Sequence, residues 1–340
     1  MKKIVFAAIL AVCAVTIGYF VIQERQSPTV FDYGLYFPGL VDQINDVTEI
    51  RITTNQEKFS IRYMGEKWIL DVANNYPVRF ELVRNFLIGM SQLRKLEPKT
   101  NDSDKHSVLN LLGVGVEGSS TILIELIFSQ SEPRAQIFVG TSRISVKNPS
   151  LREYYVRDPG ESQTWLTESG LEVTTIPFDW IDLEISDLDN SQVREVSIMR
   201  SDDKPIRVYQ SSIESGNFEL EGIPQGYKVR HQYVINDIGD LFRRLNFVDV
   251  RLADDWTSSG VSATAFTFSG LKLNAQAGSG DFEGYYIFSA EVDDSVSEEI
   301  VNQAAMLNEK FEGWVYKLSD QRTETINSRF EDLIEPVEDN

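Results

Sequence analysis

Apolar and polar residues alternate in two short segments that share one pattern. The segments read VTEIRI at 47–52 and VREVSI at 193–198, so the phrase that begins at 47 returns 146 positions later at 193. Alternation with a period of two puts every second side chain on the same face of a β-strand. Each phrase therefore predicts a strand with one buried face, carrying Ile50 and Ile52 in the first copy and Val196 and Ile198 in the second.

A second strand and a turn are expected after each of these phrases. FSIRYMGEKWILD follows the first phrase, and PIRVYQSSIESGNFELEG follows the second. Gly65 in the first stretch and Ser215-Gly216 in the second separate two apolar runs with residues that favour tight turns. Both stretches predict β-hairpins.

Two further phrases combine an aromatic residue and an arginine with apolar residues at helical spacing. They read YPVRFELVRNFL at 76–87 and YKVRHQYVINDI at 227–238. Apolar residues three and four positions apart form the buried stripe of an amphipathic helix. The stripe predicted in the first copy contains Val83, Phe86, Leu87, Met90 and Leu93, and the one in the second contains Val234, Ile235, Ile238, Leu241, Phe242 and Leu245.

The later part of each copy also contains strand-like segments. These are TILIELIF and AQIFVG in the first copy and TAFTFSGLKL and YYIFSAEV in the second, with EYYVRD at 153–158 and GWVYKL at 313–318 expected to end the two copies. The spacing from Ser295 to Glu298 is typical of a capping box and predicts a further helix. We expect an α+β protein with two related, duplicated domains of antiparallel sheet plus helix, at 30–180 and 181–340.

The N-terminus predicts one transmembrane helix ahead of these domains. Lys2 and Lys3 precede an uncharged run from Ile4 to Ile22, which is long enough to span the hydrocarbon core of a bilayer. Because basic residues favour the cytoplasmic side, residues 1–25 are expected to anchor the protein in a bacterial inner membrane by a single pass, with the C-terminal body in the periplasm. A cleaved signal peptide is one alternative.

Cys13 lies inside this run and is the only cysteine of the chain. LAVC at 10–13 offers a second alternative, a lipoprotein signal, although Val12 is branched where such a signal has a small residue. One cysteine permits no intramolecular disulfide. The expected anchor thus contains Ile4, Cys13 and Ile22, and the body is expected to be stabilised by packing.

Composition and charge narrow the functional classes. The chain has 340 residues, of which 42% are hydrophobic, as expected of a globular protein with two domains. Its 32 basic residues against 52 acidic ones give a formal net charge of −20. Such a surface repels nucleic acid.

No short motif in the chain predicts a catalytic, cofactor or metal site. GVGVEG at 113–118 matches the glycine spacing of dinucleotide sites, but it follows a helix-like segment and precedes a strand, which is the reverse of the order that such sites need. His106 lies in a polar stretch and is expected to be solvated, and His231 is expected on a helix surface or in packing. The acidic segments 182–189 and 291–299 lack the spacing of a calcium loop. We therefore expect a protein that is not an enzyme and needs no cofactor or metal.

Three arginines close to aromatic residues are the candidate ligand- or partner-binding residues. They are Arg79, Arg157 and Arg230. An arginine in such a place can bind a carboxylate or phosphate, or it can cover an aromatic ring. Both interpretations stay open at this point.

Several stretches together resemble a known family. They are YFPGLVDQINDVTEIRI at 36–52, Trp68, Tyr76-Pro77, LEPKT at 96–100, LLGV at 111–114, YYVRDPGESQTWL at 154–166 and Asp179-Trp180. With these residues the chain resembles bacterial membrane-anchored envelope proteins that contain a domain of unknown function. The resemblance implies an association with ABC-type export systems of the gliding-motility type.

Three functions are compatible with these observations. The first is a non-catalytic extracytoplasmic accessory or binding component of a membrane transport or envelope assembly, with the membrane and ABC-type transporter subunits as partners. The second is a membrane-anchored hydrolase that acts on envelope polymers or lipids. Convergent carboxylates in a pocket, or a serine beside a lysine, would support this function. The third is a binding module for an apolar ligand, which a long apolar groove would support.

Overall fold

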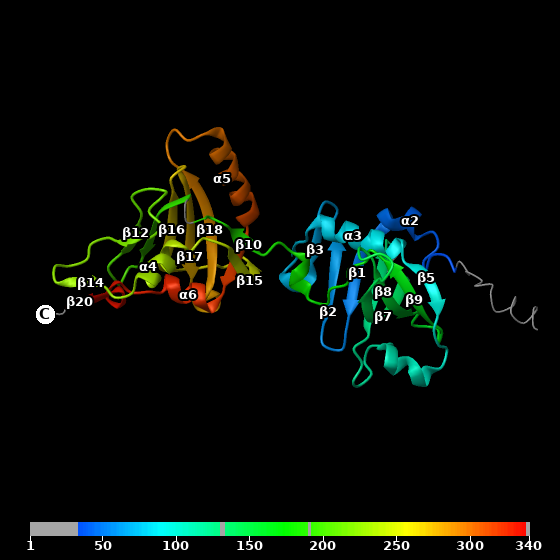
Figure 1. Cartoon of the computed structure of the whole chain (residues 1–340). Coiled ribbons are helices and arrows are strands. Elements are labelled where there is room, and N and C mark those ends of the chain that lie inside the picture. The colour runs from blue at the N-terminus through cyan, green and yellow to red at the C-terminus, as the bar shows by residue number, and fades with distance from the viewer. Residues whose placement is uncertain (1–32, 130–132, 190–191, 338–340) are drawn as a thin grey trace, which may run out of the picture. The chain divides into compact units, whose positions relative to one another are not determined.

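A computed structural model describes residues 33–129, 133–189 and 192–337 (Figure 1). The predicted anchor, with Ile4, Cys13 and Ile22, lies outside these ranges. None of the helices within them is both long enough and apolar enough to cross a membrane. The described chain is α+β, with mostly antiparallel sheets and several helices.

The first sheet has nine strands in the order β4-β3-β2-β1-β6-β7-β8-β9-β5. In chain order these strands are β1 (Val47–Thr53), β2 (Lys58–Tyr63), β3 (Trp68–Leu70), β4 (Tyr76–Pro77), β5 (Arg94–Pro98), β6 (Ile122–Phe128), β7 (Pro133–Ile144), β8 (Arg152–Arg157) and β9 (Thr164–Ser169). Neighbouring strands from β6 to β9 pair antiparallel, and β5 pairs antiparallel with β9.

The second sheet also has nine strands, in the order β10-β15-β19-β18-β17-β16-β11-β12-β13. They are β10 (Glu184–Ser186), β11 (Val193–Met199), β12 (Ile206–Tyr209), β13 (Glu219–Leu220), β15 (Leu245–Leu252), β16 (Ser258–Thr267), β17 (Leu271–Gly278), β18 (Tyr285–Val292) and β19 (Trp314–Leu318). A separate two-stranded sheet joins β14 (Tyr227–Val229) to β20 (Ile334–Pro336).

The two large sheets share the order of eight strands. The first reads β3-β2-β1-β6-β7-β8-β9-β5 from one side, and the second reads β13-β12-β11-β16-β17-β18-β19-β15. Each strand of the first order therefore has a counterpart in the second. By this order EYYVRD in β8 corresponds to YYIFSAEV in β18, so the expectation that EYYVRD ends the first copy is wrong. GWVYKL lies in β19, the last strand in chain order of the second large sheet.

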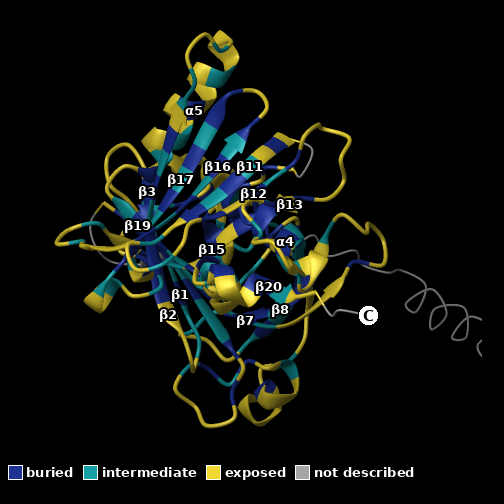
Figure 2. Cartoon of the chain, turned by 90° about the vertical axis from the view of Figure 1, so that its left-hand side faces the viewer, coloured by how far each residue is buried: buried dark blue, intermediate teal, exposed yellow. Residues whose placement is uncertain are grey.

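The predicted alternation is present in the first strand of each order. Ile50 and Ile52 of β1 are buried, as are Val196 and Ile198 of β11. The hairpins after these strands turn at glycines with positive φ, 85° at Gly65 and 71° at Gly216, a conformation that favours glycine. In Figure 2, β16 and β17 alternate between buried and intermediate residues, which is the pattern of a sheet with one well-covered face.

The described chain also contains five α-helices of 4 to 14 residues and several 3₁₀ turns. The α-helices are α2 (Leu40–Gln43), α3 (Phe80–Ser91), α4 (Gln232–Gly239), α5 (Glu298–Phe311) and α6 (Asp320–Ile326). The 3₁₀ turns are η1 (Ile44–Asp46), η2 (Asp71–Ala73), η3 (Ser103–Leu109), η4 (Pro177–Trp180), η6 (Gly280–Phe282) and η7 (Phe330–Leu333). The stripe predicted for α3 is buried from Val83 to Met90.

Two helix predictions need correction. The second stripe was expected to continue to Leu245, but α4 ends at Gly239 and Leu245 begins β15, so its later apolar residues are buried outside the helix. The capping box expected from Ser295 is wrong, because Ser297 is the N-cap of α5 and its side chain makes no capping hydrogen bond. Ser295 instead has a φ of 65° in the preceding turn.

The chain groups into two compact units that are not continuous segments. The first runs to Val47 and also contains Thr53–Gln56 and Asn85–Val173. The second contains Thr48–Ile52, Glu57–Arg84 and the chain from Thr174. The domain boundaries expected at 30–180 and 181–340 stay a prediction.

Candidate functional site

Arg157, one of the three predicted arginines, is buried in the first unit. Its Nε and Nη2 donate to the Leu111 carbonyl at 3.3 and 3.0 Å, and Nη1 donates to the carbonyls of Glu161 at 2.8 Å and Asp158 at 3.3 Å. The guanidinium carbon lies 4.8 Å from the centre of the Phe138 ring. Burial lowers the pKa of Arg157, against the effect of Tyr36 and Asp158. These contacts tie two loops to β8.

Arg79 and Arg230 make equivalent backbone contacts in the second unit. The Arg79 amide donates to the Trp180 carbonyl at 3.0 Å, and the Arg230 amide donates to the Leu333 carbonyl at 2.9 Å. The Arg230 guanidinium also donates to the Ile334 carbonyl at 3.1 Å. Arg79 and Arg230 are exposed, and a ligand- or partner-binding role for the three arginines stays a prediction.

The two histidines have local roles. His106 is 5% exposed and its Nε2 lies 2.8 Å from the Ser162 carbonyl, so the expectation that it is solvated is wrong. It is buried because η3 turns the polar stretch back on itself, with Asp102 as the N-cap. His231 is the N-cap residue of α4 and stacks on Tyr233, with ring centroids 5.3 Å apart.

The glycine motif at 113–118 forms a loop between η3 and β6, as its position in the sequence predicts. The Gly115 amide donates to Oδ1 of Asn55 at 2.7 Å, and Nδ2 of Asn55 donates to the Val116 carbonyl at 2.8 Å. The loop is held by this asparagine. Within the described ranges, no three His, Cys, Asp or Glu residues lie together in a way that could hold a metal ion.

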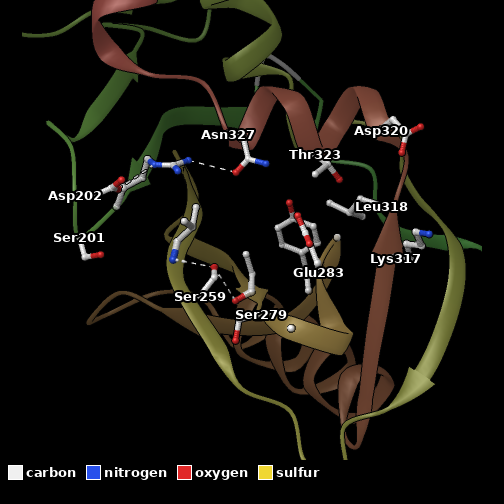
Figure 3. Close-up of a pocket in the computed structure, with 17 residues that line it drawn as sticks. Ser201, Asp202, Ser259, Ser279, Glu283, Lys317, Leu318, Asp320, Thr323 and Asn327 are labelled. Carbon is white, nitrogen blue, oxygen red and sulfur yellow. Dashed lines mark hydrogen bonds and ion pairs between the residues drawn. The ribbon is translucent and has the colours of Figure 1, made fainter.

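A polar cleft of about 760 Å³ opens at one end of the second sheet, and it is the candidate site (Figure 3). It is bounded by the turn after β11, the start of β16, the β17–β18 connection, the end of β19 and α6. Its size is that of a small-molecule pocket. Antiparallel pairing of β16, β17 and β18 brings these segments, which are far apart in sequence, to one end of the sheet.

Arg200 forms one wall of the cleft, directly after β11. Its side chain is 15% exposed, and Nη1 donates to Oδ1 of Asn327 at 3.3 Å. Nε lies 3.5 Å from Oδ1 of Asp202. That nitrogen is buried and makes no hydrogen bond to any described residue. Asn327 and Asp202 therefore hold the guanidinium in place, while its Nε makes no hydrogen bond to a described residue.

Arg329 fixes the turn that carries this wall. Its Nη2 and Nη1 lie 3.3 Å from carboxylate oxygens of Asp202 and Asp203, respectively. Asp202 is thus shared between Arg200 and Arg329. This ion-pair network joins the β11–β12 turn to the segment after α6.

Tyr286 lines the cleft and is 1% exposed. Burial raises the pKa of its phenol, while a hydrogen bond with Thr323 and the nearby charge of Arg200 lower it. The net direction is upward, so the phenol stays protonated at neutral pH. Tyr286, Thr323 and Arg200 therefore bring hydrogen-bonding groups to one region.

The remaining charged groups of the cleft are Glu283, Lys317 and Asp320 (Figure 3). Neither Glu283 nor Asp320 makes an ion pair within the described part of the chain. The hydroxyls of Ser259 and Ser279 donate to the carbonyls of Ala277 and Thr257, both at 3.2 Å. The cleft combines cations, carboxylates and hydroxyls, which suits a small polar ligand.

Sequence reasoning missed these cleft residues. A signal was present in the comparison of the two copies, because VTEIRI is followed by two threonines whereas VREVSI is followed by Met199, Arg200 and an acidic turn. A change from neutral to charged residues at matching positions is the kind of difference that marks a site in one copy.

Comparison with known proteins identifies a family for this chain. A family model described as "Domain of unknown function (DUF4340)" matches residues 68–263, more than half of the chain. The search of curated proteins returned no match. The search of solved structures also returned none.

Proposed function

Because the chain belongs to the DUF4340 family, a family of unknown function, we propose a role from its own sequence and geometry. The protein is a non-catalytic extracytoplasmic accessory or binding component of a membrane transport or envelope assembly. Its N-terminus anchors it in a bacterial inner membrane, its body lies in the periplasm, and its partners are subunits of an ABC-type transporter. The observation that carries this proposal is the uncharged run from Ile4 to Ile22 ahead of a folded, acidic body.

The body is inferred to be a duplication, which supports a binding role over a single catalytic core. The shared order of eight strands is one support. A second is that YPVR and YKVR make the same contacts, because Val78 pairs with Ile181 in a β-bridge and Val229 pairs with Ile334. The amides of Arg79 and Arg230 then donate to the carbonyls that precede those isoleucines.

Helix α5 is the surface best suited to a protein partner. It joins β18 to β19, whereas residues 158–163 join the equivalent β8 and β9 without a helix. Val301 and Met306 on α5 are 46% and 71% exposed. Most of this helix is exposed in Figure 2. Exposed apolar side chains on a helix that only one copy carries make this helix a candidate interface.

The charge near α5 indicates the chemistry of that partner. Residues 291–312 contain seven carboxylates and a single basic residue, Lys310, which pairs with Asp182 at 2.7 Å. A groove of about 990 Å³ beside the helix is lined by the apolar residues Ile300, Met306 and Leu307, and its lining also includes Glu298 and Glu299. A partner surface with apolar and basic residues complements it.

Purification from native membranes tests the proposal. The full chain, solubilised in detergent, is expected to co-purify with a defined set of membrane-transporter subunits. The variant Val301→Glu/Met306→Glu should reduce that recovery, whereas Val146→Glu, at an 87% exposed position in the other unit, should not. Recovery of the full chain alone under several mild detergents would contradict the proposal.

The hydrolase alternative retains one supporting observation, the presence of Lys317, Glu283 and serines in the same cleft. No hydrogen bond between Lys317 and a cleft serine is found in the part of the chain that the structure describes. Hydrolysis of envelope glycans or lipids by the purified chain that Lys317→Ala abolishes would favour this alternative. The binding role predicts no such turnover.

A further inference from the structure

Each side of the cleft at the end of the second sheet carries one cation and one carboxylate. Asp202 and Ser201 lie on one side, next to the guanidinium of Arg200, and Lys317 and Asp320 lie on the opposite side (Figure 3). Glu283 lies between the sides and belongs, with Asp320, to the carboxylates that have no ion-pair partner among described residues. Arg200 is therefore the candidate for holding an anion on one side, and Glu283 with Asp320 can hold a cation towards the other side.

Arg200 provides the anion site because its hydrogen-bonding capacity is largely unused. A guanidinium has five N–H donors in a planar fork that matches a carboxylate or phosphate. The described residues take one of these donors, from Nη1 to Asn327, and the Nε–Asp202 contact is a 3.5 Å ion pair without a hydrogen bond. The side chain of Arg200 is 15% exposed and lines the cleft. An anionic ligand in the cleft would accept hydrogen bonds from its remaining N–H groups.

The other charges limit what that anion can be. The lining contains three carboxylates, of Asp202, Glu283 and Asp320, against the two cations Arg200 and Lys317. A phosphate dianion would bring two negative charges close to these carboxylates. A monoanionic carboxylate brings one, and a ligand that also carries an ammonium group gains from Glu283 and Asp320.

We propose that this cleft binds a small zwitterion of the short-peptide class, with its carboxylate on Arg200 and its ammonium group on Glu283 and Asp320. The hydroxyl of Thr323 and the Asn327 amide, which also line the cleft, are placed to bond the polar groups between the two ends. A cleft of about 760 Å³ has room for two or three residues. The inference does not depend on the transporter partner, because all of these residues belong to the second unit.

Calorimetric titration of the purified full chain with trialanine tests this ligand class. Matched ligands remove one charge each: the C-terminal amide of trialanine lacks the carboxylate, and N-acetyl-trialanine lacks the ammonium group. Trialanine is expected to bind, and each blocked form is expected to bind about tenfold more weakly. Equal binding of trialanine and its amide, tighter binding of inorganic phosphate, or no binding of trialanine up to about 10 mM would overturn the proposal.

Two variants test which cleft residue binds each charged end of the ligand. Arg200→Gln should bind trialanine and its amide equally, and Glu283→Gln should bind trialanine and its N-acetyl form with nearly the same affinity. Lys228→Gln removes an exposed cation of the same unit outside the cleft and should leave all three affinities unchanged. If Arg200→Gln does not fold, the affinities of the blocked ligands for the unmodified chain still show whether the cleft binds a zwitterion. This outcome is separate from co-purification with a transporter, so either proposal can fail alone.

Discussion

The side-chain amide of Asn308 satisfies both backbone groups of Ala290. Nδ2 of Asn308 donates to the Ala290 carbonyl and the Ala290 amide donates to Oδ1 of Asn308, both at 2.8 Å. Strand β18 pairs with β17 on one side, where Ala290 lies opposite Leu273, and with β19 on the other side only at Tyr285 and Tyr286. The edge of β18 that faces away from β17 therefore has no neighbouring strand at Ala290 among those that the structure describes. Helix α5 thus closes a free strand edge with one side chain, which protects it from pairing with another chain.

Replacing Asn308 should therefore destabilise the second unit. Asn308→Leu leaves one backbone donor and one acceptor of Ala290 without partners, and we expect a loss of about 1–3 kcal/mol in the free energy of unfolding. Denaturant unfolding measures this loss. Asn302→Leu, on an exposed position of the same helix, is the matched control and should change the free energy of unfolding by less than about 0.5 kcal/mol. Equal effects of the two variants would mean that the Ala290 contact contributes nothing.

Gly239 ends α4 in a place where no larger residue fits. A Cβ atom at this position would lie 2.2 Å from Cδ2 of Phe218, which is itself buried. We expect Gly239→Ala to lower the free energy of unfolding by about 1–3 kcal/mol through overpacking. Gly160→Ala, whose nearest neighbour would be 3.4 Å away, is the control.

A second substitution checks the cause of the Gly239 effect. Phe218→Ala removes the ring atoms and the Cγ that the new Cβ would meet, so Gly239→Ala should cost less in the Phe218→Ala background than alone. A double-mutant cycle measures this coupling. Additive effects would rule out the contact with Phe218 as the cause.

Tyr285 should make stability depend on alkaline pH. Burial, and then the hydrogen bond to Asp249, raise the pKa of its phenol to about 12 from the usual 10.0. Between these values the unfolded chain releases the proton and the folded chain keeps it, so the contribution of Tyr285 is fully present below pH 10 and is lost as pH rises towards 12. The difference in unfolding free energy between the native chain and Tyr285→Phe should therefore shrink between about pH 10 and 12. A difference that stays constant over this range would contradict the assignment.

Local patterns predicted much of the fold because they depend on neighbours in sequence. Ile50 and Ile52 alternate with polar residues and are buried in β1, and Gly65 marks a hairpin turn by its freedom to adopt positive φ. The stripe from Val83 to Met90 became α3 for the same reason. Each of these features follows from a period of two or 3.6 residues or from one special residue.

Features that depend on distant residues were missed. His106 looks solvated in a polar stretch, and only the position of the Ser162 carbonyl shows that it is buried. The need for glycine at position 239 depends on Phe218, which lies in the preceding hairpin region. The cleft around Arg200 is assembled from five separate segments of the second half, and no short motif could indicate it.

We propose that an N-terminal anchor holds the body on the outer side of the inner membrane. Protease added to intact spheroplasts that produce the full chain with a C-terminal epitope tag tests it most directly, with a cytosolic protein as the control for lysis. We expect the tag to be lost from intact spheroplasts while the control protein survives. We also expect untreated full-length protein to stay in the membrane after extraction with alkaline carbonate. A tag that is degraded only after the spheroplasts are lysed, or a chain that carbonate releases, would contradict it.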